Sequence, residues 1–155
     1  MKLRVCASGR LRKGPELALF NKYKLRSEKI GRLINVFPID VLEYDSSRWI
    51  RFLKGIESSK SFPSRSHKIL LDERGRIFSS NAFAEPLRSI RDSGITEIIF
   101  FIGAADGVPA KLRDNFDEIL SLGEMVWPHF LTRVMLMEQI YRASTILAAL
   151  PYHKE

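Results

Sequence analysis

The chain of 155 residues is poor in the residues that bind metals or form cross-links, with one cysteine and three histidines. A single cysteine cannot form an internal disulfide, and three histidines far apart in the sequence make a poor metal-ligand set with it. No apolar run approaches the roughly 18 to 20 residues that a membrane-spanning helix needs, and the first residues lack the charge and hydrophobicity pattern of a signal peptide. We therefore expect a cytoplasmic protein that binds no metal.

Repeats and phosphate-binding glycine motifs are also missing. The sequence contains neither G-x-G-x-x-G nor G-x-x-x-x-G-K-[ST], so a dinucleotide or triphosphate cradle is not supported. Hydrophobic residues make up 45% of the chain, of which aromatic residues are a substantial part. This composition is typical of a folded globule, and the length suits one domain over residues 1–155.

Positive charge is concentrated in the first 33 residues, which hold ten lysines or arginines against two glutamates. Because the whole chain carries a net charge of +7, the remaining residues sum to about −1. A basic segment on an otherwise neutral globule is typical of a protein that binds a polyanion, and nucleic acid is the first such partner. A solvated helix face rich in lysine would give the same pattern.

Strand-like and helix-like segments alternate along the chain, which favours an α/β fold with a mainly parallel sheet flanked by helices. We expect a turn at residues 73–76, a mobile loop at 58–66, and an N-cap at Ser79 or Ser80. The residue patterns predict strands at 3–7, 35–44, 67–72 and 95–102, a further short apolar run at 118–122, and helices at about 15–30, 48–56, 81–91 and 130–150.

In parallel sheets, ligands bind beyond the carboxyl ends of the strands. Here these ends fall near Leu71, at the loop from Gly103 to Gly107, and after residues 118–122. We expect the three loops to meet in one pocket. The glycines allow backbone to approach a ligand closely, although a tight turn between a strand and a helix would need them equally.

The C-terminal third combines an elbow at residues 127–129, an apolar helix and a polar tail. His129 would lie at the helix N-terminus, where the helix dipole lowers the pKa of a histidine, so it is either a neutral proton acceptor or a simple cap. The helix is apolar nearly all round, which fits a core helix or a helix shared between two subunits. Glu138 and Arg142 are four positions apart and can pair on one face.

With these residues laid out, the whole chain resembles the small SPOUT-class methyltransferases, specifically the ribosomal RNA large subunit methyltransferase H family. The resemblance rests on strings that this sequence shares with the family: Met1-Lys2-Leu3, Leu71-Asp72 with Gly75, Ile102-Gly103-x-x-x-Gly107, Leu120-Ser121-x-x-x-Met125-x-x-Pro128-His129-x-Leu131-x-Arg133-Val134, Glu138-Gln139-x-Tyr141-Arg142-Ala143 and Pro151-Tyr152-His153-Lys154.

The resemblance implies an α/β knot, in which the C-terminal part threads through a loop to form a trefoil and two subunits pair to complete the site. It also implies transfer of a methyl group from S-adenosylmethionine to N3 of a pseudouridine in 23S ribosomal RNA, in the large subunit or the assembled ribosome. By the same resemblance, the residues that would contact the cofactor are Leu71, Gly103, Leu122, Gly123, Glu124, Met125, Val126 and Trp127.

Three positions depart from the family pattern: Ala104 stands in place of a second glycine, Gly123 in place of a frequent serine, and Trp127 in place of a smaller apolar residue. Alanine in a left-handed backbone conformation would cost on the order of 1 kcal/mol. We infer that position 104 does not need that conformation.

Methylation of N3 requires that its imide proton leave, so the site needs a base. His129 is the first choice and Tyr152 the second. Arg142 and Lys154 would stabilise negative charge on the neighbouring carbonyl oxygens or hold phosphates, and His153 would stack or hydrogen bond nearby. We expect the tail to reach the site of the other subunit, and the basic N-terminal helix to bind rRNA.

Three other functions fit parts of this pattern. A ribosome-associated RNA-binding protein of knot fold would keep the basic segment but not bind the cofactor. A SPOUT enzyme acting on transfer RNA would share the fold, although the C-terminal string speaks against it. A small nucleotide-binding sheet domain would need phosphate-loop glycines that the sequence lacks.

Overall fold

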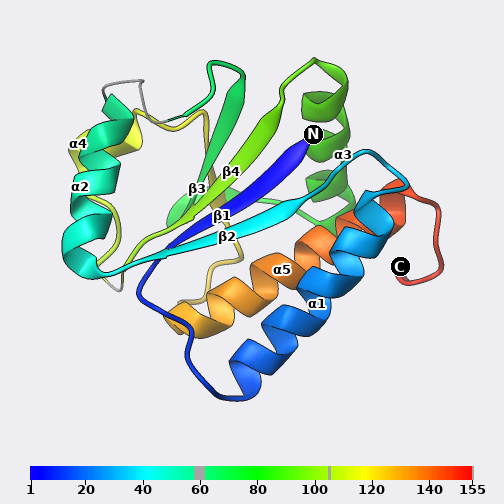
Figure 1. Cartoon of the computed structure of the whole chain (residues 1–155), viewed down its shortest axis with the longest axis horizontal. Coiled ribbons are helices and arrows are strands. Elements are labelled where there is room, and N and C mark those ends of the chain that lie inside the picture. Colours follow the sequence, from blue (N-terminus) through cyan, green and yellow to red (C-terminus); the bar gives the residue numbers. More distant parts are fainter. Residues whose placement is uncertain (58–61, 105, 155) are drawn as a thin grey trace.

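A five-stranded parallel sheet forms the centre of the protein, with helices on both faces (Figure 1). The computed structural model describes residues 1–57, 62–104 and 106–154. The strand order is β2-β1-β4-β3-β5, which confirms the predicted α/β class and parallel sheet. The elements are β1 (Lys2–Ser8), α1 (Pro15–Gly31), β2 (Ile39–Tyr44), α2 (Ser46–Glu57), β3 (Ser66–Ile77), α3 (Ser80–Asp92), β4 (Glu97–Ile102), α4 (Ala110–Arg113), β5 (Glu118–Ser121) and α5 (His129–Leu147).

Two apolar cores lie on opposite faces of the sheet. Helices α1, α3 and α5 cover one face, and α2 and α4 cover the other (Figure 1). Alternate side chains of each strand enter opposite cores, as the pleat requires: Phe100 joins the first core, whereas Phe101 joins the second. Every residue of β4 is buried, as expected for a strand covered on both faces. Cys6 is fully buried in the second core and is structural.

The predicted turn at residues 73–76 is wrong, because β3 continues through these residues to Ile77. The strand is irregular there: both Leu71 and Arg76 pair with Leu120 of β5, with a shift of register between them. A Cβ on Gly75 would lie 2.5 Å from the backbone carbon of Leu120. Gly75 is therefore needed for the close approach of two backbones. Glycine is also typical of turns, so the sequence pattern does not distinguish the two cases.

Several element boundaries also differ from the prediction. β2 begins at Ile39, after the cis peptide bond between Phe37 and Pro38, and it is an edge strand as the proline indicated. α5 ends at Leu147, three residues early, and the short helix α4 was not predicted. Residues 58–61 of the predicted loop lie outside the described residues.

The cap of α3 follows the expectation for a serine at a helix N-terminus. The Ser79 hydroxyl accepts a hydrogen bond from the backbone N–H of Ala82 at 3.1 Å. None of the helices in the described part of the chain is long and apolar enough to cross a bilayer.

Candidate functional site

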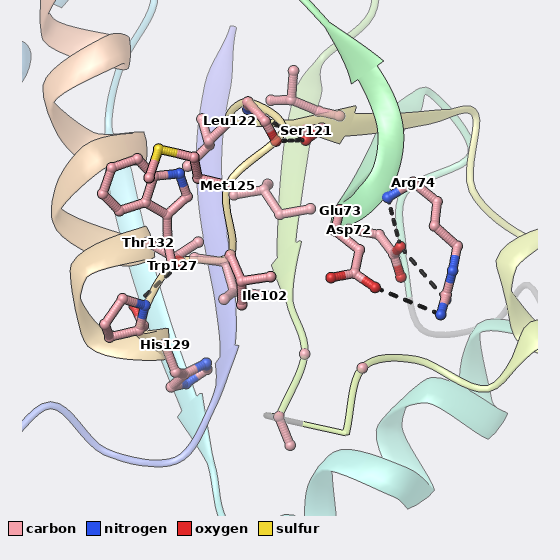
Figure 2. A pocket seen from close by; sticks show the side chains of 18 of the residues that line it. Asp72, Glu73, Arg74, Ile102, Ser121, Leu122, Met125, Trp127, His129 and Thr132 are labelled. Atoms are coloured by element: carbon pink, nitrogen blue, oxygen red, sulfur yellow. Dashed lines mark hydrogen bonds and ion pairs between the residues drawn. The ribbon is translucent and has the colours of Figure 1, made fainter.

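A pocket of about 350 Å³ lies at the carboxyl ends of β4 and β5, beside the irregular stretch of β3 at residues 71–74 (Figure 2). The three predicted regions meet there, although the region after Leu71 belongs to β3 and is not a loop, and the predicted cofactor residues line the pocket with one exception. Glu124 is exposed and is not among the lining residues. The predicted residues in the lining are Leu71, Gly103, Leu122, Gly123, Met125, Val126 and Trp127.

Tight backbone packing forms the wall that follows β4. A Cβ on Gly103 would lie 3.3 Å from both the Gly107 backbone carbon and the Val108 side chain. The Gly107 N–H donates to the Ala104 carbonyl at 2.8 Å, and Gly107 has a φ of 74°. Ala104 is not among the described residues with positive φ, as we inferred from the sequence. The glycines thus close a turn and also leave the pocket wall bare of side chains.

A second backbone turn follows β5. The Ser121 hydroxyl donates to the Gly123 carbonyl at 2.8 Å and accepts a hydrogen bond from the Gly123 N–H at 3.3 Å. Gly123 has a φ of 125°, which side-chain-bearing residues rarely adopt. This turn directs the chain away from the sheet and into residues 124–128.

Apolar and polar side chains occupy opposite sides of the pocket. Met125 and Trp127 lie on one side, and Asp72, Glu73 and Arg74 lie on the other (Figure 2). Met125 is 71% exposed and Val126 is 80% exposed, which is unusual for such side chains in a single chain. The loop therefore presents apolar surface at the rim of the pocket.

Asp72 lines the pocket, although from the sequence it was named only within the shared string Leu71-Asp72 and was given no role. Its side chain is only 5% exposed, and its Oδ2 lies 3.5 Å from Arg113 Nε. Its Oδ1 accepts a hydrogen bond from the backbone N–H of Arg74 at 3.1 Å. Its place directly after Leu71 at a strand end was the available sign, but the pairing with Arg113 depends on the tertiary fold.

His129 lies at the first position of α5 and lines the pocket. Its Nε2 is 2.6 Å from the Ser8 carbonyl oxygen and 2.8 Å from Arg133 Nη2. Burial is the main cause that lowers the pKa of His129. The Ser8 carbonyl opposes this effect and the Arg133 cation adds to it. The direction of this pKa shift agrees with the expectation from the sequence, although its leading cause is burial and not the helix dipole.

The other predicted catalytic residues cluster at the far end of α5. Glu138 Oε1 accepts hydrogen bonds from Arg142 Nη2 at 2.6 Å and from the Tyr152 hydroxyl at 3.1 Å, so the predicted pairing of Glu138 with Arg142 is confirmed. Arg142 also lies 3.3 Å from His153 Nδ1, whereas Lys154 is exposed. Burial, followed by the hydrogen bonds that Tyr152 forms with Tyr23 and Glu138, raises the pKa of Tyr152.

Within one chain, His129 and the predicted catalytic residues at the far end of α5 lie apart. At about 1.5 Å per residue, the helical rise from His129 to Arg142 is roughly 20 Å. The chain turns after α5 and places the Tyr152 ring against Tyr141, with 4.4 Å between ring centroids. Tyr152 and His153 therefore pack against α5, and residues 151–154 are not among the residues that line the pocket.

The molecule thus combines a parallel sheet of order β2-β1-β4-β3-β5, a pocket walled by glycine backbone and a half-buried histidine at the rim of that pocket. The family model described as "Predicted SPOUT methyltransferase" matches residues 1–153. The chain belongs to this family of methyltransferases.

More specific relatives are similar along their whole length and share one name, "Ribosomal RNA large subunit methyltransferase H". The protein of that name from Cereibacter sphaeroides is 46% identical over 159 residues, with 99% of each chain covered. The one from Paracoccus denitrificans is 42% identical over 156 residues, with 100% of each chain covered.

A solved structure, that of the SpoU methyltransferase AviRb from Streptomyces viridochromogenes in complex with AdoMet, shares 9% identity with this chain. The match covers 91% of this chain and 57% of that one, with a TM-score of 0.43. This likeness is below the level that establishes a common fold.

Proposed function

We propose that the protein methylates N3 of a pseudouridine in 23S ribosomal RNA, with S-adenosylmethionine as the methyl donor. The observation that carries this proposal is the pocket at the carboxyl ends of β4 and β5, beside residues 71–74 of β3, with His129 at its rim. Its lining includes seven of the eight residues that the family resemblance assigns to the cofactor, all but Glu124, and relatives named methyltransferase H align with the chain from end to end.

The shape and chemistry of the pocket suit S-adenosylmethionine, which supplies an electrophilic methyl group when bound. Gly103 leaves a bare backbone wall, and Leu122, Met125 and Trp127 offer apolar surface for a flat base. The Asp72 carboxylate faces the same space and favours a ligand that carries positive charge. These residues would hold the cofactor mainly through backbone groups and apolar contacts.

His129 is the group best placed to accept the N3 proton. It lines the pocket, and its lowered pKa keeps the imidazole neutral and able to take a proton. Tyr152 is the second choice for the base, but its raised pKa disfavours the phenolate. Arg142 and Lys154 would stabilise the charge that develops on the base carbonyls, and His153 would orient Arg142.

A homodimer would complete the site, because the two groups of residues are roughly 20 Å apart along α5 within one chain. Apolar side chains at the rim of the pocket and on the first turn of α5 form an exposed patch that a second copy would cover. This rim patch consists of Met125, Val126, Trp127, Phe130 and Leu131. In such a dimer, the tail of one subunit approaches the pocket of the other.

The basic N-terminal segment would bind the rRNA of the large subunit or of the assembled ribosome, which places the enzyme in the cytoplasm. Lys22, Arg26, Lys29 and Arg32 are exposed on or next to α1, as phosphate contacts require. The C-terminal trefoil knot implied by the family resemblance stays a prediction.

Mass spectrometry of rRNA fragments tests the proposal. Ribosomes from cells that lack the gene are incubated with purified protein and S-adenosylmethionine, and one pseudouridine should gain a methyl group. Methylation of tRNA with no change in rRNA would favour the transfer RNA alternative. Absence of both methylation and cofactor binding by calorimetry would favour an RNA-binding protein without enzymatic activity.

A further inference from the structure

Arg133, on the first turns of α5, is one of the largest fully buried side chains, with 1% of its surface exposed. It does not line the cofactor pocket but lies directly behind His129. Its Nη2 contacts the carbonyl oxygens of Ser8 and Gly9, the latter at 2.9 Å, and lies 2.8 Å from His129 Nε2. A buried guanidinium is costly unless it is paired, so these contacts need an explanation.

Counting hydrogens assigns the tautomer of His129. Arg133 Nη2 carries two hydrogens but has three neighbours that can accept them. If the Ser8 and Gly9 carbonyls take both, His129 Nε2 carries its own hydrogen and donates it to Ser8, so that both carbonyls and the ring nitrogen have partners, while Arg133 Nε finds none among the described residues. If Nε2 accepted from Arg133 instead, two lone pairs would face each other across the 2.6 Å between Nε2 and the Ser8 oxygen.

Glu43 of β2 holds Arg133 from the other side. Glu43 Oε1 accepts from Arg133 Nη1 at 2.8 Å and from the Leu11 N–H at 2.7 Å. One carboxylate therefore ties the loop after β1 to the guanidinium behind the pocket. The side chain of Glu43 remains 28% exposed, so a substitution there disturbs the core little.

We propose that Arg133, held by Glu43, is a positioning residue that fixes the His129 ring with its Nε2 hydrogen on the Ser8 carbonyl and leaves Nδ1 as the proton acceptor. The proposal rests on the proposed function only in naming a proton transfer. Arg133 touches neither the cofactor pocket nor a reacting atom, and it acts through the ring. The charged groups facing His129 are Arg133 with Glu43 behind the ring, and Asp72, Glu73, Arg74 and Asp106 across the pocket.

Nitrogen-15 NMR of the histidine rings tests this assignment on the intact protein, without substrate or cofactor. The chain has three histidines, so a His129→Gln spectrum identifies the signals of this ring. We expect one neutral tautomer, with the hydrogen on Nε2. A hydrogen on Nδ1 would overturn the proposal, whether or not the protein methylates rRNA.

Two substitutions should move the pKa of His129 in opposite directions. Arg133→Met removes the cation and frees the ring, so the pKa should rise and the two tautomers should mix. Glu43→Gln leaves an acceptor for Arg133 but removes the charge that compensates it, so the pKa should fall while the tautomer persists. A general loosening of the site would raise the pKa in both variants, and that result, or no change in Arg133→Met, would refute the proposal.

Arg88→Met is the matched control, because Arg88 forms an exposed pair with Glu85 at 2.6 Å on α3 and should leave the His129 signals unchanged. If Arg133→Met does not fold, the Glu43→Gln and Arg133→Lys variants still test the proposal. The lysine variant keeps the charge but not the fork of donors, so it should keep the low pKa and lose the single tautomer.

The rate of methyl transfer provides a separate test. In Arg133→Met, methyl transfer should fall by about 10- to 100-fold in kcat, as expected when a catalytic group loses its alignment, with cofactor affinity within about twofold of the original. An equal loss in cofactor affinity would contradict a role behind the ring. If the unsubstituted protein shows no methyl transfer, the proposed function fails, and the NMR result still stands or falls independently.

Discussion

The two ends of α5 contrast in what surrounds their functional side chains. At the N-terminal end, His129 is half-buried beside a cation and a carbonyl, and burial is the main cause that lowers its pKa. At the C-terminal end, the Glu138 carboxylate raises the pKa of Arg142 through a hydrogen bond. One end therefore favours a neutral base, and the other a persistent cation.

This contrast shows why neither end is sufficient for the proposed reaction. Removing a proton from N3 needs an acceptor, and the charge left on the base needs a cation close to its carbonyl oxygens. The cofactor pocket adjoins only the N-terminal end. A second copy that places its C-terminal end against this pocket would supply the missing part.

Deletion of residues 151–155 should have the largest effect. Methyl transfer should fall by about 1000-fold or more, because in the proposed function the removed groups orient the substrate and stabilise its charge. Cofactor binding measured by calorimetry should remain, because the pocket is lined by residues at the other end of the helix. Loss of both methyl transfer and cofactor binding would mean that the tail supports the pocket itself. This result would contradict the assignment of separate roles to the two ends of α5.

Mixing two inactive variants should restore part of the activity. In the proposed homodimer, co-expressed His129→Ala and 151–155-deleted chains would form mixed dimers, in which one of the two shared sites keeps both its histidine and its tail. About a quarter of the original activity is expected at equal amounts, since about half of the dimers are mixed and each has one intact site. No recovery in purified mixed dimers would mean that each site is built from a single chain.

A smaller effect should appear in the dependence of stability on pH. The folded pKa of His129 lies below its ordinary value of 6.5, so the unfolded chain binds this proton more readily. The associated stability is present above that value and lost as the pH falls through it toward the folded pKa. Unfolding in urea from pH 7.5 to 5 should show this loss in the original protein and not in His129→Gln.

The matched control for this measurement is Phe130→Leu, which changes the adjacent position without removing a titratable group. It should keep the pH dependence of the original protein. If His129→Gln also kept it, the burial of His129 would not be the source of the effect.

The smallest effect should come from Glu124. This residue is exposed and does not line the pocket, although the family resemblance places it among the cofactor residues. Glu124→Gln should leave cofactor affinity within about twofold, as is usual for a surface substitution. The contrasting variant is Gly103→Val, which should weaken cofactor binding strongly. Even a Cβ at position 103 would lie 3.3 Å from the backbone carbon of Gly107. A large loss in Glu124→Gln would show that the loop closes on the cofactor through this side chain.

Most of the fold could be predicted from local patterns. The strand predicted at residues 95–102 contains β4, the helix predicted from about residue 15 begins at Pro15, and the predicted N-cap is Ser79. Two of the three regions that form the pocket are loops after strands, as predicted from the rule that parallel strands end together. These features depend on interactions between residues near each other in the sequence, or on a general rule of sheet geometry.

Other features could not be predicted, because their cause lies in distant segments. Gly75 is a residue type typical of turns, but here the close backbone of β5 requires its small size. Arg133 is charged, and charged side chains usually lie on the surface. Contacts with Ser8, Gly9 and Glu43 instead hold it buried behind His129. The sequence alone determined the order of the main elements, most of the residues of the pocket and the chemistry available at each end of α5. Only the tertiary structure decided that His129 lies on the pocket and the tail does not, because a rigid helix separates them and no local pattern records that distance.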